Sequence, residues 1–362
     1  MPVPNILMSR LLNQQLANNN QFSPAELCGW MGAIQSQDFG AAKWAIGLRN
    51  PALKDTDVEE AYNRGEILRT HLMRPTWHFV SPENIRWLLQ LTSPRVDALC
   101  KYNYRRLELD DAIFNRSNQI ITNALAQNNF LTRNEIGEVL GINGITATDL
   151  RLIHLMIKAE LDGLVCSGPM KGKQFTYALM EERVKNQPTP DRDECLSRLA
   201  QLYFYSHGPA TVPDFAWWSG LAAKDVAKAI ELAKHGLNKE TIEGKVYWFK
   251  DIVCTMHNDE PSCFLVPNFD EYLISYKDRD LMLEGLDGDL KSPRGNIIFS
   301  NAVIIDGRIA GIWKRELKKD RVLMEINCFR RLDAGKLEAI HLAASMYGSF
   351  HGLEAVVEIK IL

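Results

Sequence analysis

The chain has 362 residues, of which 46% are hydrophobic and 24% charged, with a formal net charge of −3. This composition indicates a globular protein with room for about two to four domains, and it argues against a protein that coats nucleic acid through bulk positive charge. Seven scattered cysteines without a C-x-x-C pair exclude the usual metal spacing and favour reduced thiols. No apolar run approaches the ~20 residues that cross a bilayer, and the N-terminus lacks a signal pattern, so we expect a cytoplasmic protein without a membrane partner.

The N-terminal part contains two well-marked helix starts. Ser23-Pro24-Ala25-Glu26 combines an N-cap serine, a proline at the first helical position and a capping-box glutamate, and we expect the amphipathic run that it opens to stay helical as far as Gln37. Ser81-Pro82-Glu83 opens a second helix in the same way. Between them, RTHLMRPTWHFV (69–80) mixes β-branched, aromatic and basic residues, which is typical of a strand or wing.

The middle of the chain carries an internal repeat. From residue 117 the patterns predict three helices followed by a hairpin, and the same order returns about 79 residues later, with Thr211 at the position of Thr132. Gly163 and Gly236 are expected to stop the third helix of each copy. Three helices and a hairpin form the winged-helix plan, a variant of the helix-turn-helix. A rougher third copy is expected near the N-terminus.

After Pro261 the sequence is rich in short β-prone runs. The Asp-Gly pair in IIDGRIAG predicts a hairpin turn, and a last helix over 336–347 precedes a final strand. We predict an α+β protein of tandem winged-helix units followed by a C-terminal β-barrel-like domain, which is either a small, partly closed barrel or a curled sheet. Its predicted divisions are a winged-helix-like unit with flanking helices at 1–110, a second winged helix at 111–190, a third at 191–260, and the barrel-like domain at 261–362.

Familiar catalytic motifs are absent from the sequence. It contains neither G-x-G-x-x-G after a strand nor a P-loop, and the eight histidines show no H-E-x-x-H spacing. A G-x-S-x-G elbow is also missing. These absences remove the simplest support for a nucleotide-dependent enzyme, a zinc enzyme or a serine hydrolase.

Two segments are candidate DNA contacts. Residues 308–331 carry eight Lys and Arg against three Asp and Glu, a local charge of +5 around a predicted hairpin, which suits phosphate contacts or, alternatively, a merely solubilising turn. In 69–80, an aromatic residue beside cations suits stacking on an unpaired base, or alternatively a strand whose Trp is core. The candidate residues are Lys314, Arg315, Lys318 and Lys319 in the first segment, and Arg69, His71, Arg74, Trp77 and His78 in the second.

Two amides, Gln35 and Gln37, stand one residue apart in GAIQSQD (32–38). On a regular helix, side chains two positions apart point roughly 200° away from each other, so they converge only where the helix ends. Such a pair is usually solvated polar surface. We expect Asp38 to cap the next helix, over 39–48, in preference to a catalytic role.

Five segments together resemble one known family. They share its order from about residue 5 to the C-terminus, and the family is that of the bacterial winged-helix DNA-binding proteins that include the AlkZ-type DNA glycosylases. The segments are GAIQSQDFGAAKWAIGLR, RTHLMRPTWHFVSPE, DFAWWSGL, LVPNFDEYLISYKDRD and AVIIDGRIAGIWKR.

This resemblance implies a glycosylase that cradles double-stranded DNA and excises bulky alkylated or crosslinked purines without a metal or cofactor. No lysine stands out as a Schiff-base nucleophile, so we expect a monofunctional enzyme. The family's catalytic signature is Gln-x-Gln with an aliphatic middle residue, which implies Gln35 and Gln37 as the catalytic pair, whereas Ser36 departs from the aliphatic pattern. A repair enzyme of this kind is expected to be a monomer. The alternatives are a non-catalytic winged-helix regulator, which would dimerise on paired half-sites, and a protein-interaction scaffold that would not bind DNA.

Overall fold

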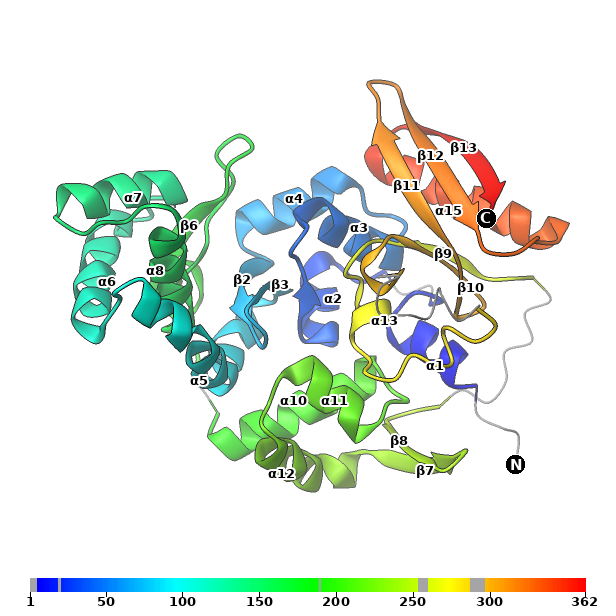
Figure 1. Cartoon of the computed structure of the whole chain (residues 1–362), viewed down its shortest axis with the longest axis horizontal. Coiled ribbons are helices and arrows are strands. Elements are labelled where there is room, and N and C mark those ends of the chain that lie inside the picture. Colours follow the sequence, from blue (N-terminus) through cyan, green and yellow to red (C-terminus); the bar gives the residue numbers. More distant parts are fainter. Residues whose placement is uncertain (1–4, 19–20, 189, 253–259, 287–296) are drawn as a thin grey trace.

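Helices and strands are interspersed along the described parts of the chain in a mixed α+β structure, as predicted. The computed structural model describes residues 5–18, 21–188, 190–252, 260–286 and 297–362. In Figure 1, the helices α6 (Asp111–Leu125), α7 (Arg133–Ile142) and α8 (Asp149–Leu161) lie at one end, the C-terminal sheet lies at the other, and the strands β2 (Leu68–Leu72) and β3 (Thr76–Val80) lie between them. Among the described helices, none combines the length and apolar character needed to cross a membrane.

The N-terminal part contains five helices around a small antiparallel sheet with strand order β1-β3-β2. The predicted Ser23 capping box is present, and the segment 69–80 is a hairpin, as predicted. The elements are α1 (Ile6–Asn13), α2 (Pro24–Met31), β1 (Ile34–Gln35), α3 (Phe39–Arg49), α4 (Asp55–Arg64), β2 (Leu68–Leu72), β3 (Thr76–Val80) and α5 (Pro82–Arg106).

The two central copies of the repeat share one construction. Thr132 and Thr211 both close capping boxes, and the residue before each of them pairs with a wing strand, as Leu131↔Tyr177 and Ala210↔Trp248. The first copy holds α6 (Asp111–Leu125), β4 (Leu131–Thr132), α7 (Arg133–Ile142), α8 (Asp149–Leu161), β5 (Val165–Ser167), β6 (Thr176–Leu179) and α9 (Met180–Arg183). The second holds α10 (Arg192–Ser206), α11 (Val212–Ser219), α12 (Ala223–Ala233), η1 (Lys234–Gly236), β7 (Asn238–Ile242) and β8 (Lys245–Phe249).

The glycine stops differ between the copies. Gly163 follows α8 with a φ of 68°, the left-handed conformation that ends helices, as predicted. The prediction for Gly236 is wrong, because α12 ends at Ala233 and Gly236 closes the 3₁₀ turn η1 without a positive φ.

The C-terminal part is an open five-stranded sheet with strand order β13-β12-β11-β10-β9. The predicted Asp-Gly turn is present, with φ values of 49° at Asp306 and 81° at Gly307. The barrel-like form is not confirmed: α15 carries the chain across to place β13 parallel to β12, so β13 and β9 remain the two edges of the described sheet. The elements are β9 (Cys263–Val266), α13 (Glu271–Ile274), η3 (Ile297–Phe299), β10 (Ala302–Ile305), β11 (Arg308–Leu317), β12 (Arg321–Cys328), α15 (Ala334–His351) and β13 (Glu354–Ile361).

Two hydrophobic clusters form the core. One joins the N-terminal helices, the α10–α12 region and the C-terminal sheet, whereas the other consists of buried residues from 96 to 179. Trp77 of β3 packs against the second cluster, and its neighbour Phe79 belongs to the first. The β2–β3 hairpin therefore lies where the two cores meet.

Candidate active site

Gln35 and Gln37 lie on an extended segment, so the prediction of a helix through Gln37 is wrong. The helix α2 ends at Met31, Gly32 turns the chain with a φ of 78°, and Gln35 then pairs with His78 of β3. The ladder continues through the Ser36 N–H, which donates to the Trp77 carbonyl at 2.7 Å. Because residues two apart share a side of an extended backbone, the 200° separation of a helix does not arise.

Both carboxamides contact the same hairpin. Arg74 Nη2 donates to Gln35 Oε1 at 3.2 Å, and the Trp77 N–H donates to Gln37 Oε1 at 3.4 Å. Gln35 is only 8% exposed, whereas Gln37 lies at the surface. One amide is thus held inside the protein by a cation, and the other borders solvent.

Glu271 anchors the backbone of this segment from the far part of the chain. Its carboxylate accepts the Gln35 N–H at 2.8 Å and the Trp218 Nε1–H at 3.1 Å, contacts the Ser275 hydroxyl, and lies 3.7 Å from His207 Nε2. Burial by itself would raise the pKa of Glu271, but His207, Ser275 and the Gln35 N–H outweigh burial and lower the pKa to about 2. A buried, ionised carboxylate therefore lies directly behind β1.

The charges around Gln35 are balanced. Burial lowers the pKa of Arg74, and the negative charge of Glu271 opposes that shift. Burial, together with the charge of Arg74, lowers the pKa of His78 to about 4, so its ring is neutral at pH 7. His78 Nδ1 donates to the Thr76 carbonyl at 3.0 Å, which fixes the ring. The surroundings of the amide hold one cation and one anion.

Arg69 binds the backbone of residues 35–37, which we call the glutamine segment. Its Nε and Nη2 donate to the Ser36 carbonyl at 3.1 and 2.9 Å, and Nη2 lies 3.5 Å from the Gln37 carbonyl. Ser36 is fully buried, and its hydroxyl has no hydrogen-bond partner among the described residues. An interior position of this kind suits the aliphatic residue of the family pattern better than a serine.

A second buried contact ties the hairpin to α8. His71 Nδ1 lies 2.5 Å from Glu160 Oε2, and the His71 N–H donates to the same oxygen at 3.0 Å. The His71 ring is 4.0 Å from that of Trp77. This contact joins β2, β3 and the second core into one support for β1.

The predicted DNA contacts of 69–80 are brought together, but mostly inside the protein. Arg69, His71 and His78 are buried, and Arg74 and Trp77 are half-buried. The structure gives these residues a supporting position around Gln35, and their contact with DNA stays a prediction. Asp38 caps α3 by accepting the Ala41 N–H at 3.0 Å, as predicted.

The basic hairpin is formed by β11 and β12 and lies apart from β3, the strand that pairs with β1 (Figure 1). Lys318 pairs with Glu316, and the guanidinium of Arg315 lies 5.6 Å from the Trp313 ring. Lys314 and Lys319 are exposed and join no ion pair in the described ranges. The predicted hairpin is present, Lys314, Lys318 and Lys319 are exposed, and Arg315 is half-buried. The role of these residues in DNA binding stays a prediction.

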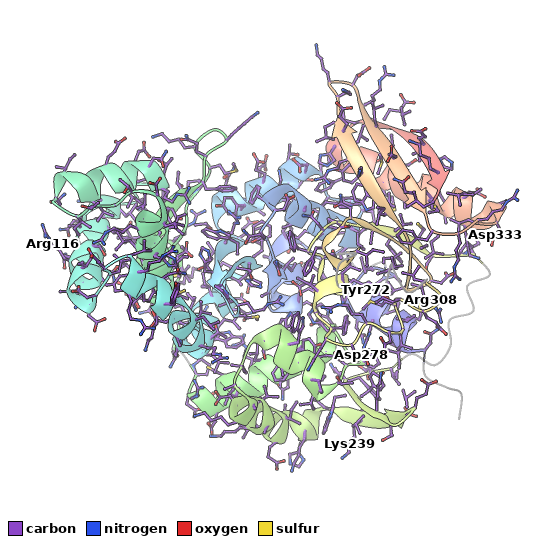
Figure 2. All side chains as sticks on the ribbon, viewed as in Figure 1. Arg116, Lys239, Tyr272, Asp278, Arg308 and Asp333 are labelled. Atoms are coloured by element: carbon purple, nitrogen blue, oxygen red, sulfur yellow. The ribbon has the colours of Figure 1, made fainter. Side chains whose placement is uncertain are left out.

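Sequence reasoning missed Glu271 and Trp218. Both lie in segments used only as family signatures, NFDEYL and DFAWWSGL. Figure 2 places Tyr272, the residue after Glu271, near the middle of the molecule, whereas Arg116 and Lys239 lie at its outer edges. An acidic residue among aromatic residues was the available signal, but local sequence does not say which carboxylate is buried.

The described residues hold no cluster of three His, Cys, Asp or Glu side chains that could bind a metal ion. The cysteines in these ranges are free thiols. The polar groups around β1 are therefore amides, guanidinium groups, imidazoles and the Glu271 carboxylate.

Comparisons with known proteins identify the family and the fold of the chain. The model of the family described as "DNA glycosylase AlkZ-like" matches residues 28–350. A curated protein of Streptomyces sahachiroi, named "Interstrand DNA cross-link repair glycosylase", is 23% identical over 322 residues, which are 84% of this chain and 85% of that protein. The solved structure of "Streptomyces sahachiroi DNA glycosylase AlkZ" has a TM-score of 0.79 and 19% identity, covers 98% of both chains, and shows a shared fold. Since the family model covers most of the chain, including both glutamines, this chain belongs to the AlkZ-like DNA glycosylase family.

Proposed function

We propose that this protein is a monofunctional DNA glycosylase that hydrolyses the N-glycosidic bond of alkylated purines in duplex DNA. The main support is the pair of carboxamides of Gln35, in β1, and of Gln37, two residues beyond it, which contact the same hairpin. Arg74 orients the oxygen of Gln35, the Trp77 N–H holds that of Gln37, and Glu271 and Arg69 fix the backbone between them. Groups fixed before the substrate arrives are those that stabilise a transition state most effectively.

The proposed chemistry suits neutral amides. An N3- or N7-alkylated purine is already a cation, so it leaves as a neutral base and needs little help from an acid. The bond between C1′ and the purine nitrogen breaks with its electron pair going to the base, a water oxygen forms the new bond to C1′, and the released proton passes to solvent. An amide oxygen has two acceptor positions. Arg74 occupies one on Gln35 Oε1, and in this mechanism the other accepts from the attacking water.

The power of such a site is modest, which fits its substrate. Positioned dipoles contribute roughly 10²–10³-fold in rate for each group. Undamaged bases are poor leaving groups and survive this degree of assistance. The Streptomyces sahachiroi relative is named for interstrand cross-link repair, and we include crosslinked purines in the proposed range.

We further infer that residues 111–190 and 191–260 are winged helices that grip the duplex and that the β11–β12 hairpin contacts phosphates. Three helices and a wing recur in both units, and the hairpin carries the candidates Lys314, Arg315, Lys318 and Lys319. The protein is proposed to act as a monomer on DNA of varied sequence. Light scattering that gives a dimer, with a footprint on paired half-sites, would favour a regulator instead.

The decisive experiment measures abasic sites in a duplex that carries 7-methylguanine. The wild-type protein releases the base, and Gln35→Ala lowers the single-turnover rate by about 10²–10³-fold while DNA affinity stays nearly unchanged. Gln119→Ala, the same change at an exposed position of α6, retains the wild-type rate. Equal rates for Gln35→Ala and wild type would remove the mechanism.

A further inference from the structure

A pocket of about 310 Å³ lies beside the glutamine segment, between the β2–β3 hairpin and the β5–β6 wing. Its volume is at the lower end of the roughly 300–1,000 Å³ typical of small-molecule sites. Arg69 and Trp77, two of its walls, also contact the backbone or side chain of Gln37. The pocket is therefore adjacent to the proposed active site without containing either glutamine.

The walls of the pocket are aromatic and cationic. Four rings line it, and the Arg69 guanidinium lies 4.4 Å from the Trp77 ring and 4.6 Å from the Phe175 ring. Phe175 is 37% exposed, so a large part of this apolar ring is open to solvent. The rings are those of Tyr62, Trp77, Phe175 and Tyr177.

The charge of the pocket is uniformly positive. Arg69, Arg133 and Lys173 line it, and no Asp or Glu is among its lining residues. Arg69 is only 6% exposed, and in the described ranges it hydrogen-bonds carbonyl oxygens and joins no ion pair. The nearby Glu160 and Asp38 lie outside the pocket, where Glu160 binds His71 and Asp38 caps α3. A buried cation without a carboxylate partner is costly, and an anionic ligand would offset that cost.

The exposed ring of Phe175 and cations that join no ion pair among the described residues together suit a nucleotide. Bases stack on aromatic side chains without regard to sequence, and cations bind the attached phosphate. The same charge disfavours a purine that is itself a cation, because like charges repel in a partly buried site. The pocket is thus unsuited to an alkylated purine before cleavage and suited to an ordinary one.

We propose that the pocket between the β2–β3 hairpin and the β5–β6 wing binds an unstacked, uncharged nucleobase together with its phosphate. The ligand is a nucleoside monophosphate unit, either an undamaged nucleotide of the DNA that leaves the stack beside the lesion or a free mononucleotide. The first source rests on the proposed function, and the second does not. The lesion itself stays at Gln35 and Gln37.

The test uses the Gln35→Ala variant of the full chain, so that binding is measured without turnover. The probes are the deoxyribonucleoside of 2-aminopurine, its 5′-monophosphate, and two duplexes that carry 2-aminopurine either paired or as a single unpaired nucleotide. Stacking on the pocket's rings quenches the fluorescence and yields a Kd for each probe. The monophosphate is expected to bind about tenfold more tightly than the nucleoside. In competition, guanosine monophosphate is expected to displace the probe better than its cationic 7-methyl derivative.

Matched variants test whether the ligand binds in this pocket. Lys173→Gln is expected to raise the Kd of the monophosphate about three- to tenfold, because it removes one lining cation. Lys171→Gln, the same change two residues away on the same loop, removes a lysine that pairs with Glu135 outside the pocket, and it leaves the Kd unchanged. Phe175→Leu raises the Kd about tenfold for every probe, because one stacking ring is lost.

Equal Kd values for nucleoside and monophosphate, or an unchanged Kd in both Lys173→Gln and Phe175→Leu, would overturn the proposal. Tighter binding of the unpaired than of the paired duplex assigns the site to DNA. Binding of the free monophosphate with no preference between the duplexes assigns the same site to free nucleotides. Base release is measured separately with wild-type protein, so a failure of the proposed glycosylase chemistry is distinguished from a failure of this pocket.

Discussion

The glutamine segment and the β11–β12 hairpin are both expected to meet DNA, but they are built in opposite ways. The strand β1 has two residues, and the segment from Gln35 to Gln37 is held by partners from the β2–β3 hairpin and from α13. The hairpin has strands of ten and eight residues, and the charged side chains near its tip are exposed. One region is short and fixed from within, and the other is long and reaches into solvent.

Each region has the construction that its expected task requires. Bond cleavage depends on the position of a few polar atoms, and buried hydrogen-bond partners hold such atoms better than exposed ones. Attraction of a phosphate backbone depends on charge at the surface and tolerates motion of the side chains. The contrast predicts that one chemical change has unequal effects in the two regions.

The largest expected effect on stability comes from removing the charge of Glu271. Glu271→Gln leaves the Gln35 N–H, the Trp218 Nε1–H and the Ser275 hydroxyl facing a neutral group and leaves Arg74 without its nearby anion, so the free energy of unfolding falls by about 3–5 kcal/mol. Glu316→Gln breaks only the exposed pair with Lys318 and costs about 0–1 kcal/mol. Urea unfolding at pH 7 measures both. Similar losses of unfolding free energy in the two variants would contradict this contrast between the buried and the exposed region.

A change of pH is expected to have a smaller effect on stability, through His78 in the buried region around Gln35. Burial lowers the pKa of His78 from 6.5 to about 4 in the folded protein, so the unfolded chain binds its proton more readily and stability falls as the pH drops from 6.5 toward 4. Between pH 7 and pH 5, the titration of His78 lowers the free energy of unfolding by about 2 kcal/mol. Urea unfolding at both values is expected to show a weaker pH dependence in His78→Gln than in wild type. His235→Gln, at an exposed position, keeps the wild-type dependence.

Local features of this fold could be predicted from the sequence, because they depend on neighbouring residues. The caps at Ser23, Asp38 and Thr132 and the turn at Asp306 each need only a few adjacent side chains. These local signals predict where the helices that follow the three caps begin and where the β10–β11 hairpin turns.

The features that could not be predicted from the sequence depend on pairing between residues far apart in the chain. The chain forms a strand at Gln35 because β3 is available beside it and because Glu271, 236 residues away, accepts its N–H. The open sheet likewise depends on β13 joining parallel to β12 after α15. Glu271 has no local pattern that distinguishes it from a surface acid. The catalytic pair was inferred from family resemblance, whereas its support could be seen only in three dimensions.

The smallest expected effect on stability is at the hairpin, where the effect on DNA binding is clear. The double variant Lys314→Gln/Lys319→Gln changes two exposed lysines without ion pairs in the described ranges, so the free energy of unfolding changes by less than about 0.5 kcal/mol. If both lysines contact phosphates, the slope of log K against log salt becomes shallower by about 1.8. Fluorescence anisotropy with an undamaged duplex at several salt concentrations measures this slope.

The matched control is Lys336→Gln/Lys360→Gln, which removes the same charge from the same domain at lysines already paired with Asp333 and Glu325. Their carboxylate partners keep these lysines from releasing counterions on binding, so the slope stays at the wild-type value. Equal slopes in both double variants would mean that net charge, and not the hairpin, attracts DNA. A shallower slope only in the hairpin variant, with an unchanged single-turnover rate at saturating DNA, would separate binding by the hairpin from chemistry at β1.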